Sequence, residues 1–223
     1  MTRYCNYLSL ILISRISTPK TANEYNYLYY CVLFPIRQLY FSIRAVLTYA
    51  LRAVTIKGND SNTIMEVPPL KTKVMLICHG NICRSPMAEF ILKDMVRRRG
   101  IEDDFVIASS ATSREEIWGE VGNPVYPPAQ RELAAHGISC EGKRAVQLTK
   151  GDYKLYDYLL CMDKNNLRNA KRIVGHDRDN KLRLLLSYAG GGDIADPWYC
   201  GNFGRTYAYI VRGCESFLRE LGY

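Results

Sequence analysis

The sequence has few of the features that mark membrane-spanning, metal-binding or disulfide-rich secreted proteins. In its first seventy residues the longest uncharged runs, 4–14 and 25–36, are shorter than the roughly 20 residues that a membrane-spanning helix needs, so no stable membrane insertion is expected. The three histidines lie far apart and no CxxC pair accompanies them, so no metal or other cofactor is predicted. The eight cysteines are dispersed, which favours a reducing cytoplasm over a disulfide scaffold.

A concentrated basic surface is also missing, although the formal net charge is +8. Residues 1–70 carry seven Lys and Arg against three Asp and Glu, so they contribute +4 and the remainder contributes the other +4. The main basic cluster, residues 97–99, follows an apolar helical pattern and has no interleaved aromatic residue. We interpret it as a solvated helix end, favoured by the helix dipole, and expect no nucleic-acid partner.

Glycine is almost absent from the N-terminal third of the chain. Residues 1–70 contain one of the 16 glycines but 8 of the 17 tyrosines, so the two parts of the chain are not built alike. We predict an N-terminal extension of unknown role at residues 1–72 and one domain at residues 73–223. Residues 1–64 are interpreted as non-native coding sequence before a start at Met65, with an interfacial helix over residues 36–56 or a secretory signal as alternatives.

Apolar patterns after residue 72 alternate between strand and helix. Residues 74–77, 105–108, 158–162 and 182–186 read as strands, and residues 128–136, 164–174 and 203–221 read as helices, with one more helix following the first strand. Gly100 and Gly137 are expected to end the two helices that precede them. This alternation predicts an α/β fold whose parallel sheet is covered on both faces.

The loop after the first strand, residues 78–85, has the sequence CHGNICRS, with five residues between Cys78 and Arg84. This spacing alone is weak evidence, because residues 31–37 repeat it. That second stretch lacks glycine, and its Pro35 has no N–H group to offer an anion. Between a strand end and a helix start, successive backbone N–H groups can surround a bound dianion, so residues 78–85 are predicted to bind phosphate.

Three side chains of this loop carry the predicted chemistry. The positive field favours the thiolate of Cys78, which we predict to be the nucleophile. Arg84 offers a planar fork that matches two phosphoryl oxygens as charge spreads over them. Ser85 can cap the following helix, and its hydroxyl can donate to the Cys78 sulfur and help the thiolate to leave.

The other loop residues, His79, Gly80, Asn81, Ile82 and Cys83, are predicted to bind substrate by their place in the loop. Gly80 permits a positive φ or a close approach of phosphate, and Asn81 either pins the loop through bonds to backbone or is an ordinary turn residue. The His79 side chain is expected to point away from the anion. Cys83 is either a small packing residue or a partner for a protective disulfide with Cys78.

A proton donor for the leaving group is sought in residues 193–199. Asp196 is the candidate acid, with Asp193 as its local competitor and an ordinary Asp-Pro turn as the plain alternative. Pro197 stiffens the loop, and Trp198 and Tyr199 offer flat faces that can receive an aromatic leaving group.

Residues 78–89 resemble the signature of the low-molecular-weight protein tyrosine phosphatases. Residues 157–166 resemble the strand of that family that ends in Met-Asp, and residues 196–199 resemble its acid loop. The resemblance implies a three-layer α/β/α domain with a four-stranded parallel sheet, a phosphocysteine intermediate, no metal, and Asp196 acting as acid and then as base. It implies tyrosine-phosphorylated proteins as substrates and inorganic phosphate as product. Trp118 is a guess for a further hydrophobic residue of the rim.

Two other activities share this scaffold. An arsenate reductase needs relay cysteines, commonly a close pair, whereas Cys140 and Cys161 are 21 positions apart. Protein-arginine phosphatases tend to have threonine where this chain has Ile82. A catalytically silent phosphate-binding module could dispense with the nucleophile and the acid, and both are present. Phosphotyrosine hydrolysis is therefore the predicted activity.

Overall fold

In the computed structural model, residues 71–223 are described. The predictions for the first part of the chain, namely the start at Met65, the secretory signal and the interfacial helix over residues 36–56, lie outside the described residues. The second Cys-to-Arg spacing, residues 31–37, also lies outside them. The fold, the active site and the groove beside it are those of residues 71–223.

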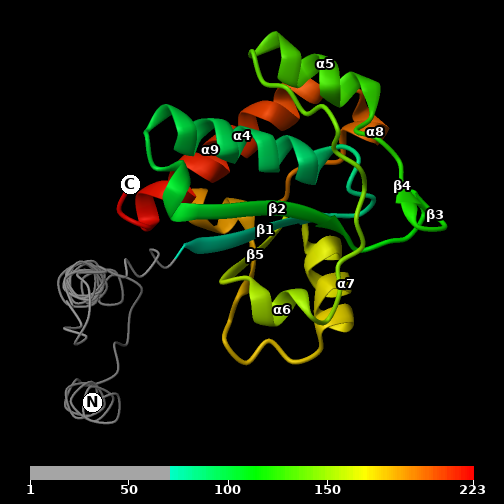
Figure 1. The fold of residues 1–223 in the computed structure, drawn as a ribbon, viewed down its shortest axis with the longest axis vertical. Coiled ribbons are helices and arrows are strands. Elements are labelled where there is room, and N and C mark those ends of the chain that lie inside the picture. The colour runs from blue at the N-terminus through cyan, green and yellow to red at the C-terminus, as the bar shows by residue number, and fades with distance from the viewer. Residues whose placement is uncertain (1–70) are drawn as a thin grey trace, which may run out of the picture. The chain divides into compact units, whose positions relative to one another are not determined.

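Four parallel strands form the central sheet (Figure 1). They are β1 (Thr72–Cys78), β2 (Phe105–Ala111), β5 (Tyr158–Cys161) and β6 (Leu182–Leu184), in the order β2-β1-β5-β6. All three neighbouring pairs are parallel, which confirms the predicted four-stranded parallel sheet. The chain order changes direction between β1 and β5, and ligands of open α/β sheets bind beyond the carboxyl ends of the strands at such a point.

Helices cover both faces of the sheet and complete the predicted three layers. Figure 1 shows α4 (Arg84–Arg98), α5 (Pro127–Ala135) and α9 (Phe203–Glu220) on one face and α6 (Asp152–Leu155) and α7 (Lys164–Val174) on the other. The central strand β1 is buried on both sides, because Val74 and Leu76 pack in one core cluster while Met75 and Ile77 pack in the other. This is why its sequence is a continuous apolar run.

The predicted helix ends are confirmed. Gly100 has a φ of 65° just after α4, and Gly137 has a φ of 73° just after α5, a backbone conformation that a side chain disfavours. At the start of α7, Asp163 accepts a hydrogen bond from the Asn166 N–H at 2.6 Å. Within residues 71–223, none of the helices is both long and apolar enough to cross a membrane.

The fourth strand is shorter than predicted. β6 ends at Leu184, and residues 185–189 form the 3₁₀ helix η3 (Leu185–Ala189) instead. Leu185 and Leu186 are both buried in the cluster on the α9 side of the sheet. Because successive residues of a strand point to opposite faces, a continued strand could not have placed both leucines there.

Besides η3, five short elements were not predicted as strands or helices. They are η2 (Glu102–Asp104), the hairpin strands β3 (Ile117–Trp118) and β4 (Val121–Gly122), and the short helices α6 and α8 (Pro197–Cys200). α8 lies in the segment that was predicted to be the acid loop, and the hairpin carries Trp118, the guess for a further residue of the rim.

Candidate active site

The phosphate-binding loop joins the end of the central strand to the start of α4. Cys78 is the last residue of β1 and Arg84 is the first residue of α4. The backbone N–H groups of Gly80, Ile82 and Cys83 donate no hydrogen bond within residues 71–223, and the first turn of a helix leaves further N–H groups unpaired. The loop therefore holds several donors that an anion can accept from.

The Cys78 sulfur accepts two hydrogen bonds. The Asn81 N–H lies 3.2 Å from Sγ and the Ser85 hydroxyl lies 3.0 Å from it. Hydrogen bonds to the charged form of a group favour that form, so both donors stabilise a thiolate. The Ser85 side chain does not cap α4: the cap position is Cys83, and it makes no side-chain cap bond. The capping prediction was wrong because the hydroxyl is directed to the sulfur.

Asn81, rather than Gly80, adopts the left-handed backbone conformation in this loop, with a φ of 58°. Its buried side chain donates to the hydroxyls of Ser85 and Ser109, each at 2.8 Å, and accepts from the Val146 N–H at 2.9 Å. Asparagine tolerates a positive φ better than most residues with a side chain, and the three bonds fix it there. The loop shape thus depends on segments 28 and 65 positions away in sequence.

The hydrogen bonds continue from Asn81 to a buried carboxylate. The Ser109 hydroxyl donates to Glu89 Oε2 at 2.5 Å, and Glu89 also receives Lys143 Nζ at 2.9 Å and Lys93 Nζ at 2.5 Å. Each hydroxyl that accepts from Asn81 therefore donates onward, Ser85 to the sulfur and Ser109 to the carboxylate. Burial alone would raise the pKa of Glu89, but the charges of Lys143 and Lys93 and the hydrogen bonds from Lys93 and Ser109 lower it.

We expect Lys143→Met to lower the free energy of unfolding by about 1–3 kcal/mol near neutral pH, because it removes a charged partner of buried Glu89. The lowered pKa means that ionised Glu89 stabilises the fold above the ordinary carboxyl pKa of about 4.3, and that this contribution is lost as pH falls through the folded-state value. The difference between variant and parent should therefore begin to shrink below about pH 4.3 and shrink further as pH falls through the folded-state pKa of Glu89. Urea unfolding near neutral pH and at a series of pH values below about 4 measures it.

The matched control is Lys150→Met, which removes an exposed lysine and should change stability by less than about 0.5 kcal/mol. A Lys143→Met effect that stays constant down to the lowest pH at which the protein remains folded would show that the ion pair with Glu89 does not carry the stabilisation.

Arg84 is buried and lies between two carboxylates. Its guanidinium pairs with Asp163 and Asp196 and donates to the Ile194 carbonyl at 3.0 Å. Burial would lower the Arg84 pKa, but the negative charges of Cys78, Asp196 and Asp163 raise it above its ordinary value. Its Nε is buried and has no hydrogen-bond partner among residues 71–223. A buried donor without a partner is costly, and a phosphoryl oxygen in the loop would satisfy it.

The two candidate acids have different surroundings. Asp196 pairs with Arg84, and its other oxygen accepts from the Trp198 N–H at 3.1 Å. Asp193 accepts from the Lys164 N–H at 3.2 Å, at the start of α7. Asp196 thus faces the guanidinium of the phosphate-binding loop, whereas Asp193 accepts its hydrogen bond from a helix start.

The outer side of the loop contacts the segment after β2. His79 is half exposed and its Nε2 lies 3.0 Å from Glu115 Oε2, so the side chain points away from the sulfur. A Cβ on Gly80 would lie 2.8 Å from Glu116 Cγ. Gly80 therefore permits a close approach of Glu116, and the positive φ considered for it is not present. Glu116 in turn accepts from Asn123 Nδ2 at 2.8 Å.

Cys83 is buried, and its thiol is free. Burial, followed by the negative charges of Cys78 and Asp196, raises its pKa far above the ordinary value, so it is a protonated thiol near neutral pH. This suits a packing residue. The disulfide between Cys83 and Cys78 under oxidation stays a prediction.

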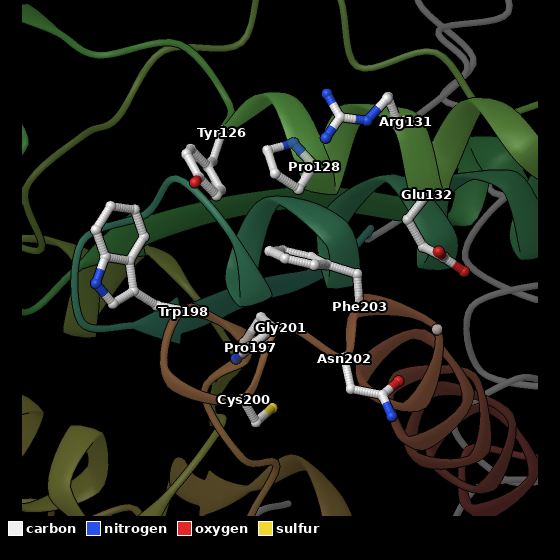
Figure 2. A pocket seen from close by; sticks show the side chains of 11 residues that line it. Tyr126, Pro128, Arg131, Glu132, Pro197, Trp198, Cys200, Gly201, Asn202 and Phe203 are labelled. Atoms are coloured by element: carbon white, nitrogen blue, oxygen red, sulfur yellow. The ribbon is translucent and has the colours of Figure 1, made fainter.

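Aromatic side chains form the rim on the side of the acid loop. Trp198 is 58% exposed and stacks at a tilt on Tyr126, with ring centroids 5.0 Å apart (Figure 2). Tyr199 is 88% exposed. Trp118, the guess for a further rim residue, is 74% exposed on the β3–β4 hairpin, which continues the segment that contacts His79 and Gly80. Ile82 is half-buried, and its carbonyl accepts from the Tyr126 N–H at 2.8 Å.

Four residues of this site were not identified from the sequence. Asp163 follows the carboxyl end of β5, the strand next to β1, so its position after a predicted strand was a usable signal. Tyr126 lies just before the predicted helix at residue 128, without a local pattern that marks it. Glu89 is the last residue of the stretch 78–89 that resembles the family signature, but no role was assigned to it or to Lys143, since only the fold brings them together.

Comparison with known proteins supports the same interpretation. A family model described as low molecular weight phosphotyrosine protein phosphatase matches residues 73–223. The chain is 41% identical over 156 residues to the low molecular weight phosphotyrosine protein phosphatase of Sus scrofa, across 66% of this chain and 94% of that protein.

Solved structures are similar over the same part of the chain. The crystal structure of YfkJ from Bacillus subtilis is 34% identical with a TM-score of 0.62, across 68% of this chain and 95% of that one. The Drosophila arginine phosphatase DARP is 30% identical with a TM-score of 0.59, across 66% of this chain and 96% of that one. With the family match over residues 73–223 and the loop on β1 and α4, the chain belongs to the low molecular weight phosphotyrosine protein phosphatase family.

Proposed function

We propose that this protein hydrolyses phosphotyrosine in proteins through a phosphocysteine intermediate on Cys78. The observation that carries the proposal is the convergence of three groups: a sulfur that accepts two hydrogen bonds, a helix start with free N–H donors, and a buried guanidinium with a free Nε. The donors bind the phosphoryl oxygens, and Arg84 stabilises the charge that spreads over them in the transition state. No metal is needed for these steps.

In the first step, the Cys78 thiolate attacks phosphorus, an S–P bond forms and the bond from phosphorus to the tyrosine oxygen breaks. The leaving oxygen takes a proton from Asp196. In the second step, Asp196 accepts a proton from water, whose oxygen bonds to phosphorus as the S–P bond breaks, and inorganic phosphate leaves. The Ser85 hydroxyl, 3.0 Å from the sulfur, stabilises the departing thiolate.

Arg84 couples phosphate binding to the acid. Without substrate its guanidinium pairs with Asp196 and Asp163. A phosphate dianion in the loop competes for the same guanidinium and repels both carboxylates, so Asp196 is released from Arg84, takes up a proton from solvent and can donate it to the leaving oxygen. Asp163 stays anchored, because its other oxygen accepts from the Asn166 N–H of α7. Asp163 therefore holds Arg84 in position, and Asp196 transfers the proton.

The rim favours an aromatic leaving group. Trp198, two residues after the acid, and Tyr126, whose ring contacts that of Trp198, offer ring faces, and ring stacking adds to the binding of a phenyl ester. Ile82 adds an apolar side chain from the loop itself. A phosphorylated tyrosine matches these surfaces better than the polar guanidinium of phosphoarginine.

A panel of phosphotyrosine, phosphoarginine and arsenate tests the assignment. We expect the highest kcat/KM with phosphotyrosine. A higher value with phosphoarginine would reassign the protein toward the activity named for its Drosophila relative. Arsenate reduction is disfavoured because Cys140 and Cys161 pack in different core clusters, and burial raises the pKa of both thiols.

We propose that residues 73–223 are the complete phosphatase domain and that it works in the cytoplasm, where the free thiol of Cys78 is kept reduced. Residues 71–223 contain two packed core clusters and every group that the proposed mechanism uses. A shortened chain that begins at Met65 should therefore keep kcat/KM within about two-fold of the full chain and unfold in one cooperative transition. If the shortened chain is inactive or insoluble under conditions in which the full chain is active, residues 1–64 are needed for folding or activity.

A further inference from the structure

A groove lies next to the acid loop, on the far side of the aromatic rim. Its volume is about 810 Å³, and it runs between α5 and the segment that joins α8 to α9. Figure 2 shows Tyr126, Pro128 and Arg131 on the α5 side, Asn202 on the opposite side, and the ring of Phe203 between them. Trp198 and Tyr126 stand at one end. The groove thus begins one residue after the proposed acid, Asp196.

The walls of the groove are apolar at its centre and polar at its edges. Phe203 and Pro128 supply apolar surface, and Gly201 and Gly204 have no side chains that would fill the space. The Asn202 side-chain oxygen accepts from the Arg205 N–H at 2.9 Å, which leaves its amide N–H groups as donors. A mixed surface of this kind suits an extended peptide, whose carbonyls need donors and whose alternate side chains need apolar contact.

One charge of the groove has no internal partner. Glu132 is paired with His136 at 3.3 Å, and His136 stacks on Tyr207. Arg131 is exposed and forms no ion pair or hydrogen bond with any of residues 71–223. The side chain best matched to this edge is therefore a carboxylate, and the groove has a preference in charge as well as in shape.

We propose that this groove binds the segment of the phosphoprotein beside the phosphotyrosine, and that Arg131 selects substrates with an acidic residue in that segment. This inference rests on the proposed function, because the phosphotyrosine must occupy the loop for its neighbours to cross the rim. Because the groove begins beside the acid loop, we expect this acidic residue within a few positions of the phosphotyrosine.

The test compares phosphotyrosine peptides that carry Glu, Gln or Lys at each of the four positions on either side of the phosphotyrosine. For the unaltered protein we expect kcat/KM to be about two- to five-fold higher for Glu than for Gln at one or more of these positions, the range of an exposed ion pair. Arg131→Glu should reverse this order and prefer Lys at the same positions. Free phosphotyrosine, which does not reach the groove, should be hydrolysed equally by both proteins.

Arg178→Glu is the matched control, because it makes the same charge change at an exposed residue that follows α7, the helix that Figure 1 shows on the opposite face of the sheet from α5. It should leave the peptide order unchanged. Gly204→Phe tests the groove without a charge change: it should raise KM for the peptides toward that of free phosphotyrosine and leave the hydrolysis of free phosphotyrosine unaltered.

The inference is overturned if no position shows a preference for Glu, or if the preference persists in Arg131→Glu. It is also overturned if Gly204→Phe affects peptides and free phosphotyrosine alike. Failure of the unaltered protein to hydrolyse free phosphotyrosine would be a different result, because it would reject the proposed function itself.

Discussion

Cys78→Ser should abolish turnover while the loop still binds oxyanions. A serine hydroxyl is far less ionised and less nucleophilic than a thiol at neutral pH, so we expect kcat/KM for phosphotyrosine to fall by at least about 10⁴-fold. The binding donors do not depend on the sulfur, since the loop N–H groups and Arg84 remain. Calorimetric titration with phosphate should therefore give a dissociation constant within about three-fold of the parent value.

Cys140→Ser is the control, because Cys140 is a buried thiol that forms no hydrogen bond with residues 78–85. It should retain turnover. Turnover in Cys78→Ser comparable to that of the parent would eliminate Cys78 as the nucleophile. Loss of phosphate binding in the same variant would contradict the claim that the loop N–H groups and Arg84 bind phosphate without the sulfur.

Asp196→Asn should slow the first step in proportion to the basicity of the leaving oxygen. For phenyl esters with poor leaving groups we expect a loss of about 10²–10⁴-fold, the usual contribution of positioned general acid catalysis. Esters with very good leaving groups barely need the proton and should lose much less. Formation of the phosphocysteine must be followed in a single turnover, because the same carboxylate activates water in the second step.

Asp193→Asn is the natural control for that experiment, since Asp193 accepts from the Lys164 N–H and should show no such dependence on the leaving group. An equal loss for good and poor leaving groups in Asp196→Asn would remove Asp196 from the acid role. If Asp193→Asn shows the dependence on the leaving group instead, Asp193 is the general acid.

Local sequence was sufficient for the sheet and for the loop. The strands of a parallel sheet are buried on both faces, so β1 reads as a continuous apolar run that ends at Cys78, and the helix pattern follows at once. Two consecutive elements thus position the nucleophile, the guanidinium and the free N–H groups. The same local pattern could not show that Leu185 and Leu186 share one side of the sheet, which depends on the packing of α9.

The support of the loop could not be predicted because it depends on distant residues. Asn81 is fixed by Ser109 and by the Val146 N–H, and Ser109 is fixed by Glu89. Lys143 reaches Glu89 across 54 positions in the sequence. In the sequence each of these is a common residue in a common setting, and only the fold joins them to the Cys78 sulfur.

The phosphate-binding loop has features that local sequence predicts and features that only the fold determines. The five-residue spacing from Cys78 to Arg84 is visible in the sequence, but the residue with the positive φ is Asn81 rather than the glycine beside it. Glycine is the usual choice for that conformation, and the exception arises because three hydrogen bonds hold the asparagine side chain. Gly80 is needed for a different reason, the close approach of Glu116.

The most direct measurement of the central claim is the location of the phosphoryl group during turnover. Asp196→Asn, mixed with an ester that has a very good leaving group and quenched in acid, should accumulate the intermediate because its hydrolysis is slowed. Mass spectrometry of the digested protein should then find one phosphoryl group on the peptide that contains Cys78, and none in Cys78→Ser/Asp196→Asn. A phosphoryl group on another residue, or product formation without any phosphorylated peptide, would contradict the account.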